Sequence, residues 1–327
     1  MSLRVGQLRG RKIHDFRQNL LPWFDEHKRD LPWRQDQDPY RVWVSEIMLQ
    51  QTRVAAVVEH YQRFLERFPT IETLAAEGEA SVLAAWSGLG YYRRARMLHA
   101  AARQVVRELD GKFPKNSEEL QKLPGIGRYT SAAIASIAFG EGVPVVDGNV
   151  ERVLQRVCGR QLGSAELWKL AGALLDEQRP GDFNQAVMEL GATVCLPKQP
   201  KCLVCPVAEM CVGRGELPGD RKIIPQRKRA MHYGLDCRNG AVFLVKRDRT
   251  ANLMPGMWEL PEIPSNNGFG PKWRTFRHSI TVTDYLVHVV NCELPAGTQG
   301  EWITKARVPK LPLTGLARKI LRAAKII

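Results

Sequence analysis

The sequence has no long hydrophobic run, because no stretch approaches the roughly 20 consecutive apolar residues that a membrane-spanning helix needs. Residues 1–16 are basic and polar and contain no apolar segment of the kind that a secretory signal requires. Internal repeats and low-complexity tracts are also absent. These absences exclude a membrane protein and a secreted protein. We therefore expect a cytoplasmic chain whose cysteines stay reduced.

Acidic residues are in short supply relative to basic ones. The 327 residues include 34 Asp and Glu against 48 Lys and Arg, which gives a formal net charge of +14. Half of this excess lies in residues 231–327, with 14 basic and 7 acidic side chains. Such an excess of positive charge indicates a polyanionic partner, of which nucleic acid is the first candidate. Excess charge can also simply maintain solubility.

Four of the seven cysteines lie within seventeen residues, in the spacing C-x6-C-x2-C-x5-C. They are Cys195, Cys202, Cys205 and Cys211. Four thiolates can hold either a tetrahedral zinc ion or a 4Fe-4S cluster, and the spacing alone does not decide between them. Free buried cysteines are the third possibility. The isolated Cys158, Cys237 and Cys292 are interpreted as small core residues.

The hydrophobic pattern changes along the chain. Between residues 14 and 195 apolar positions recur every three or four residues, and Pro and Gly separate them into short helices, which predicts an all-α region. Residues 241–245 and 281–290 are rich in β-branched and aromatic residues and are predicted strands, and 316–327 is a predicted closing helix. The length of the chain suits two or three domains. We predict a helical domain (1–212), a linker (213–230) and a smaller α+β domain (231–327).

A glycine-rich octapeptide, Leu123 to Thr130, lies between two predicted helices. Gly125 and Gly127 allow a tight turn whose backbone N–H groups face outward beside a helix N-terminus, where a phosphate can bind. The pattern is typical of a helix-hairpin-helix element. An ordinary glycine-rich connection between helices is the alternative.

Two carboxylates lie in unusual surroundings. Glu46 is flanked by apolar residues, so that burial would raise its pKa and leave it able to donate a proton. The alternative for Glu46 is a partly exposed helix residue. Asp147 precedes a helical run and is expected to cap that helix, a role that keeps it ionised and is compatible with catalysis.

Taken together, these motifs resemble the MutY-type adenine DNA glycosylases. The resemblance covers roughly residues 14–215 and rests on motifs in the family's order. These are Leu-Pro-Trp-Arg (31–34), Ser-Glu-Ile-Met-Leu-Gln-Gln-Thr (45–52), Gly-Leu-Gly-Tyr-Tyr (88–92), the hairpin, Val-Asp-Gly-Asn-Val (146–150) and the four cysteines. The resemblance implies the helix-hairpin-helix glycosylase fold, with a base pocket between two helical lobes and a 4Fe-4S cluster on the four cysteines. It favours the cluster over zinc.

The resemblance also implies a substrate and a reaction. The expected activity is hydrolysis of the N-glycosidic bond of an adenine mispaired with guanine or 8-oxoguanine. The partner would be double-stranded DNA, from which the base is flipped out of the stack. We expect a monomer that works on the bacterial nucleoid in the cytoplasm, without any membrane association.

Site residues follow from the resemblance position by position. Glu46 matches the acid that protonates adenine N7, and Asp147 matches the carboxylate that stabilises the oxocarbenium-like sugar. Tyr129 stands where endonuclease III-type relatives carry a lysine, and a phenol cannot form a Schiff base, so the strand should stay intact. Tyr129 would then stabilise the sugar-side intermediate. The remaining matches are Asn149 beside Asp147, Arg34 and Gln185 against the adenine, and Gln51 and Tyr91 wedged into the duplex.

Two other functions remain open. One is a pyrimidine-directed or bifunctional glycosylase, which Tyr129 disfavours. The other is a non-catalytic iron-sulfur protein that binds DNA, which the paired Glu46 and Asp147 disfavour.

The C-terminal region resembles the MutT-like Nudix domain of the family. Residues 253–261 are similar to its Gly-Leu-Trp-Glu-Phe-Pro segment, but no acid-rich Nudix box is present, so we expect no nucleotide hydrolysis. The family's Phe-Ser-His motif, which meets 8-oxoguanine, is altered here. Either residues 276–278 (Phe-Arg-His) or residues 280–282 (Ile-Thr-Val) replace it. We favour the second register, in which Thr281 supplies the hydroxyl and Arg277 is free for a phosphate.

Overall fold

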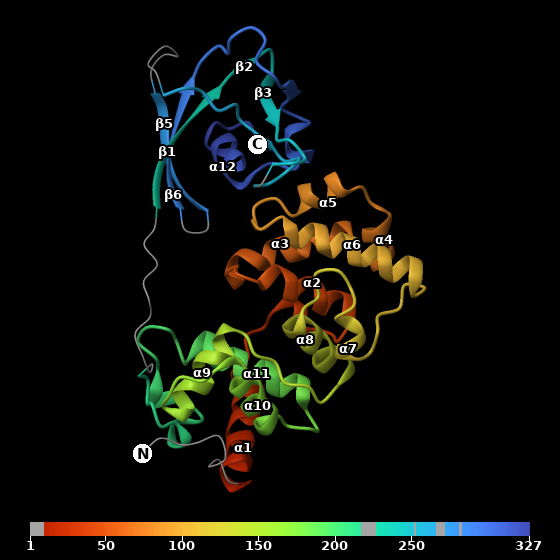
Figure 1. Cartoon of the computed structure of the whole chain (residues 1–327), viewed down its shortest axis with the longest axis vertical. Helices are drawn as coiled ribbons and strands as arrows, with labels where there is room; N and C mark the ends of the chain where they lie inside the picture. The colour runs from red at the N-terminus through yellow and green to blue at the C-terminus, as the bar shows by residue number, and fades with distance from the viewer. Residues whose placement is uncertain (1–9, 217–226, 252, 266–271, 281–282) are drawn as a thin grey trace. The chain divides into compact units, whose positions relative to one another are not determined.

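The chain forms two compact units in a computed structural model that describes residues 10–216, 227–251, 253–265, 272–280 and 283–327 (Figure 1). The first unit comprises residues 1–65, 70–72 and 100–221. The second comprises residues 66–69, 73–99 and 222–327. Across the described residues, no helix has the length and apolar character that crossing a membrane would require.

Helices account for the regular structure from Gly10 to Met210, as the sequence predicts for residues 14–195. The α-helices are α1 (Gly10–His27), α2 (Pro39–Leu49), α3 (Val54–Arg67), α4 (Ile71–Ala76), α5 (Glu79–Ala85), α6 (Arg93–Glu108), α7 (Ser117–Leu120), α8 (Arg128–Phe139), α9 (Gly148–Cys158), α10 (Ser164–Leu174) and α11 (Pro180–Thr193). Short 3-10 turns, η2 (Pro32–Arg34), η3 (Cys202–Val204) and η4 (Ala208–Met210), complete the set.

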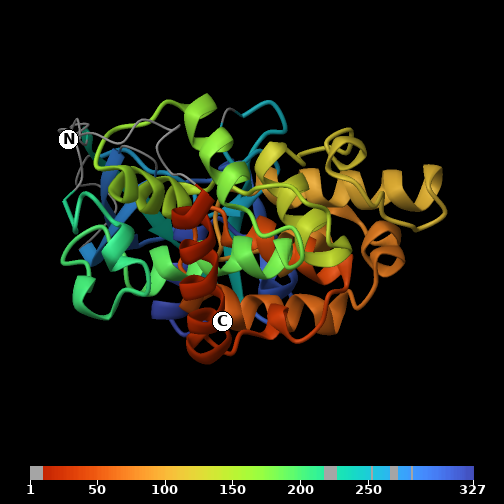
Figure 2. The same ribbon diagram turned by 90° about the horizontal axis from the view of Figure 1, so that it is seen from below.

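Helices α1, α9, α10 and α11 enclose one hydrophobic core of the first unit. Phe16, Leu154, Leu170 and Phe183 are each at most 2% exposed there. Helix α1 packs against α11, as the two views show (Figures 1 and 2). Burial of such side chains contributes about 1.5–3 kcal/mol each, which holds these helices rigidly around the site described below.

Glycines set the ends and the approach of the helices that carry that site. Gly140 is the C-cap of α8 and Gly159 is the C-cap of α9, both in the left-handed conformation that glycine adopts without strain. Gly191 lies on α11, where an added Cβ would stand 2.6 Å from the Cβ of Asn149. Only glycine lets α11 approach the start of α9 so closely.

The C-terminal region forms two small sheets with one helix. The strands are β1 (Arg227–Leu235), β2 (Cys237–Arg238), β3 (Ala241–Lys246), β4 (Trp258–Glu259), β5 (Lys272–Ile280), β6 (Thr283–Asn291) and β7 (Glu301–Thr304). One sheet has the order β1-β6-β5, and in the other β3 pairs with β2, β4 and β7. Helix α12 (Gly315–Ala323) lies between them, and its side chains share a core with both (Figure 1). The predicted α+β class is confirmed.

The sheet β1-β6-β5 differs in two details from the elements predicted from the sequence. The predicted linker runs to residue 230, but residues 227–230 form the start of β1. Strand β5 has no counterpart among the predicted strands. Both strands depend on β6, which pairs in parallel with β1 and antiparallel with β5. Such pairing is tertiary, so the exposed basic residues that open β1 carry no strand pattern of their own.

Residues 73–99 belong to the second unit, together with residues 222–327. The sequence places them in a helical domain that extends to residue 212, and the predicted domain limits remain a prediction.

The altered Phe-Ser-His stretch lies partly on β5. Phe276 is 7% exposed and packs in the core with Val287, whereas Arg277 is exposed and His278 is half-buried. Thr281 and Val282 lie outside the described residues. The preferred register is therefore still a prediction.

Candidate active site

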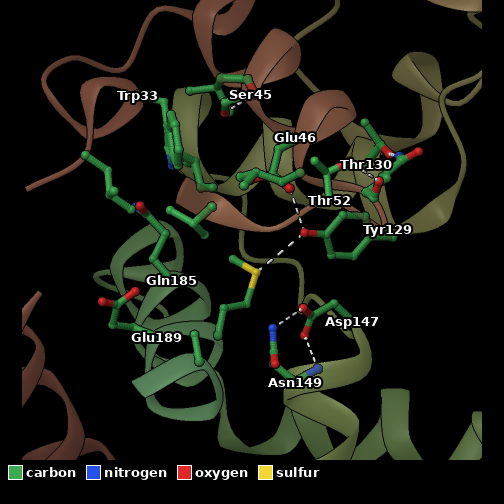
Figure 3. Close-up of a pocket in the computed structure, with 18 of the residues that line it drawn as sticks. Trp33, Ser45, Glu46, Thr52, Tyr129, Thr130, Asp147, Asn149, Gln185 and Glu189 are labelled. Carbon is green, nitrogen blue, oxygen red and sulfur yellow. Dashed lines mark hydrogen bonds between the residues drawn. The ribbon is translucent and has the colours of Figure 1, made fainter. Parts of the chain in front are cut away.

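A cavity of about 720 Å³ lies in the first unit, among α2, the hairpin before α8, the start of α9 and α11 (Figure 3). It brings together nine of the residues predicted from the sequence. They are Arg34, Glu46, Gln51, Gly125, Gly127, Tyr129, Asp147, Asn149 and Gln185. Residues more than 130 positions apart in the chain thus share one concave surface, which is the usual form of a small-molecule site.

Glu46 projects from α2 and is 6% exposed, so the partly exposed alternative is wrong. Tyr129, from the first turn of α8, donates a hydrogen bond from its Oη to Glu46 Oε2 at 2.6 Å (Figure 3). Burial raises the pKa of Glu46 to about 7, and the Tyr129 hydrogen bond opposes this rise. Burial and the nearby carboxylates raise the pKa of Tyr129 well above 10, so the phenol keeps its proton.

Asp147 caps α9, as the sequence predicts. Its Oδ1 accepts hydrogen bonds from the backbone N–H groups of Asn149 (2.9 Å) and Val150 (2.7 Å). Its Oδ2 accepts from the Asn149 side chain at 2.9 Å, and Arg152 in turn donates to Asn149 Oδ1 at 2.9 Å. Burial outweighs these hydrogen bonds, so the pKa of Asp147 lies above its ordinary value, although each hydrogen bond favours the ionised form. The cap therefore fixes the carboxylate and supports its ionised form.

The site contains a second buried glutamate that the sequence analysis does not include. Glu189 on α11 is 1% exposed and accepts from Arg29 at 2.6 and 2.8 Å. Arg34 donates to Glu189 at 2.9 Å and to Gln185 Oε1 at 3.3 Å. The hydrogen bonds of the two guanidinium groups lower the pKa of Glu189 against the opposing effect of its burial. Glu189 thereby holds Arg34 against the cavity.

Glu46 and Glu189 show opposite outcomes of the same sequence pattern. Both acids lie in apolar helical runs, so the argument applied to Glu46 could have found Glu189 as well. Glu189 also follows Gln185 by four residues, which places both on one helix face. The hydrogen-bond partners decide whether the pKa of each acid is raised or lowered, because two arginines bind Glu189 whereas a neutral phenol binds Glu46.

The hairpin has the geometry that its glycines predict. Gly125 adopts a φ of 74°, and Gly127 stands at the N-cap of α8. Leu123 and Ile126 are buried at 4% exposure and anchor the turn. The first-turn N–H groups of α8 are thus presented next to the cavity.

The four clustered cysteines line a separate cavity of about 280 Å³ in the first unit. Arg156 is 2% exposed beside them and donates to Cys195 Sγ at 3.2 Å, while its Nε has no hydrogen-bond partner. Among the described residues, no three His, Cys, Asp or Glu side chains are arranged to hold one metal ion.

Two predicted residues lie outside the main cavity. Tyr91 belongs to the second unit, where it is 48% exposed in the turn between α5 and α6. Thr281 is outside the described residues.

Comparison with known proteins places this geometry in a family. Residues 44–166 match the model of the HhH-GPD superfamily of base excision DNA repair proteins. A thermostable thymine-DNA glycosylase of known structure is 31% identical and superimposes with a TM-score of 0.58, over 63% of this chain and 98% of that one. The adenine DNA glycosylase of Rattus norvegicus is 53% identical over 224 residues. This chain belongs to the MutY-type family of that superfamily.

Other relatives of this MutY-type chain extend the comparison. The adenine DNA glycosylase of Buchnera aphidicola subsp. Schizaphis graminum is 37% identical over 230 residues, 66% of each chain. Endonuclease III in a non-covalent DNA complex is 22% identical with a TM-score of 0.55, over 65% of this chain and 97% of that one, and shows the same fold. The match covers 62% of this chain and 43% of the rat enzyme, so the chain spans less than half of that relative's length.

Proposed function

We propose that this chain is a monofunctional DNA glycosylase that removes adenine mispaired with guanine or 8-oxoguanine. The observation that carries the proposal is the pair of carboxylates in one cavity. Glu46 has a pKa near 7, and Asp147 is held by helix N–H groups. Cleavage through an oxocarbenium-like sugar needs one protonated carboxylic acid and one ionised carboxylate. The relatives named adenine DNA glycosylase support adenine as the base.

The proton path follows from the hydrogen bonds. Tyr129 occupies Glu46 Oε2, so the acidic proton resides on Oε1, which can donate to N7 of a flipped adenine. The bond between C1′ and N9 then breaks, and its electron pair passes to the protonated base. Asp147 stabilises the positive sugar, water adds to C1′, and the proton of that water passes to the Glu46 carboxylate. Atoms and charge balance at release of neutral adenine.

The wall opposite the hairpin selects the base in this proposal. Arg34 is fixed by Glu189, so its direction does not depend on the ligand. The Gln185 amide lies beside Arg34 and can pair with the donor and acceptor edge of a purine. The hairpin and the excess of basic residues support binding of the DNA backbone.

We further propose a 4Fe-4S cluster on Cys195, Cys202, Cys205 and Cys211. The cysteines line one cavity, and the buried guanidinium of Arg156 with its unpartnered Nε suits an anionic centre there. When bound, such a cluster cross-links the loop after α11, and no chemical step depends on it.

The C-terminal region is proposed to favour 8-oxoguanine as the partner base, less sharply than a full Phe-Ser-His motif would. Its exposed Arg277 suits a phosphate, and the packing of Phe276 in the core leaves that ring unavailable for a nucleotide. This supports the register that uses Thr281.

Thymine is the second candidate base, because the 31% identical structure is that of a thymine-DNA glycosylase. The deciding experiment incubates the protein with duplexes bearing adenine opposite 8-oxoguanine, adenine opposite guanine, or thymine opposite guanine. Free base is identified by chromatography, and strand breaks are compared with and without hot alkali. Adenine release with alkali-dependent breaks supports the proposal. Thymine release supports the second candidate, breaks without alkali indicate a lyase, and no release indicates a binding protein.

A further inference from the structure

One carbonyl oxygen of the C-terminal segment holds both ends of the turn between α5 and α6. Ser87 Oγ and Tyr92 Oη each donate a hydrogen bond of 2.9 Å to Leu313 O, within the second unit. All three residues are at most 3% exposed. A carbonyl oxygen has two lone pairs, so both acceptor positions are used.

The Leu313 carbonyl is itself held in place by the C-terminal fold. Trp258 on β4 forms a parallel bridge to Leu313, through bonds from Trp258 N to Pro312 O (2.8 Å) and from Thr314 N to Trp258 O (2.9 Å). Thr314 then caps α12 by accepting from Ala317 N at 3.2 Å. The carbonyl is therefore positioned by a strand on one side and a helix start on the other.

Two arginines add polar contacts between the same segments. Arg318 on α12 donates to Ser87 Oγ at 2.9 Å. Arg96 on α6 donates to Pro255 O at 2.5 Å. Hydrogen bonds have strict geometry, so these partly buried contacts define one arrangement of the two segments where apolar packing would tolerate several.

The turn between Ser87 and Tyr92 presents one exposed aromatic side chain. Gly88, Gly90 and Tyr91 all have positive φ values, of 114°, 71° and 47°. For Tyr91 this conformation costs about 1 kcal/mol, so the surrounding contacts must maintain it. Arg94 stacks on the Tyr91 ring at 5.4 Å and donates to Gly90 O at 3.4 Å.

We propose that the Leu313 carbonyl positions Tyr91 for insertion into the base stack of a mispaired duplex. The claim rests on the proposed function for its ligand, since an exposed, rigidly held ring is what unstacks bases. The C-terminal region then acts on mispair recognition through the Gly88–Tyr91 turn, in addition to any contact with the partner base. Ser87 and Tyr92 are positioning residues in this scheme.

The first test measures the turn without DNA. Tyr92→Phe and Ser87→Ala each remove one oxygen atom and keep the buried carbon framework. In the full chain, the double variant should accelerate amide hydrogen exchange in residues 86–92 about tenfold. Tyr233→Phe is the matched control, because Tyr233 is a 3% exposed tyrosine of the same unit whose hydroxyl contacts Met231 Sδ at 3.9 Å. Unchanged exchange in the turn, or equal acceleration in β6, would overturn the anchoring role.

The second test is a double-mutant cycle with Tyr91→Ala, made in a Glu46→Gln background to prevent turnover. The readout is the ratio of Kd values for a fully paired duplex and one with an adenine–guanine mispair. We expect the Ser87→Ala/Tyr92→Phe pair to lower this ratio about tenfold, or about 1.4 kcal/mol, and to have no further effect once Tyr91 is alanine. An equal loss in both backgrounds would reject the positioning of Tyr91. No mispair preference in the Glu46→Gln parent would refute the proposed function, while the exchange result would still decide the anchor.

Discussion

Tyr129 donates a 2.6 Å hydrogen bond to Glu46, a residue 83 positions earlier in the chain. This bond favours the ionised carboxylate, and burial favours the neutral acid. Burial prevails, and Glu46 titrates near pH 7.

Glu46→Gln should abolish adenine release and leave duplex affinity nearly unchanged, because an amide cannot donate the proton and Glu46 is only 6% exposed. Single-turnover release and duplex Kd are the measurements. Release within about tenfold of the parent chain, or about 1.4 kcal/mol of barrier, would contradict the assignment.

Tyr129→Phe should move the alkaline limb of the release rate to higher pH. In the parent chain the rate should fall as pH rises through about 7, since Glu46 then loses its proton. Removing a donor to the ionised form raises the pKa of Glu46 further. Single-turnover rates from pH 5.5 to 9 measure the limb, with Tyr233→Phe as the control. A limb that stays in place or moves to lower pH would refute this role of Tyr129.

Glu189→Gln should destabilise the first unit by about 3 kcal/mol, because Arg29 and Arg34 would lose their buried counter-ion. Urea denaturation measures the loss. Glu108→Gln breaks an exposed pair with Arg107 and should have no measurable effect. Equal stability of the two variants would show that the buried pairs contribute nothing.

Cys202→Ser should remove the visible absorption of an iron-sulfur cluster, since each iron needs its thiolate. Cys237→Ser is the control, because this thiol lies outside the cysteine cavity and is exposed, so its interpretation as a core residue is wrong. Stoichiometric zinc without iron in the purified parent chain would disprove the cluster and show that the four cysteines hold a zinc ion.

The two registers of the altered Phe-Ser-His stretch make different predictions. Thr281→Ala should lower the preference for 8-oxoguanine over guanine opposite adenine, and His278→Ala should leave it unchanged. Arg277→Ala should weaken binding to both duplexes equally and reduce the slope of log K against log salt concentration by about 1. The reverse result for Thr281 and His278 would favour the first register. Point variants suit this test better than deletion of residues 231–327, which would uncover Ser87 and Tyr92.

Local sequence determined much of this protein. Helical periodicity and Pro and Gly punctuation predicted the helical region, because they act over a few residues. The cap at Asp147 and the turn at Gly125 are also local, and each appears where the sequence places it. The order of the motifs was enough to indicate the family.

Only the tertiary structure decided how these parts act together. Glu46 and Glu189 lie in similar apolar helical runs, but their pKa values shift in opposite directions. Two arginines from another segment bind Glu189, whereas Tyr129 binds Glu46. Strands β1 and β5 exist through their pairing with β6, and Ser87 meets Leu313 across 226 positions. Burial and long-range partners set the charge state of an ionisable group and the pairing of a strand, and neither is encoded in the neighbouring residues.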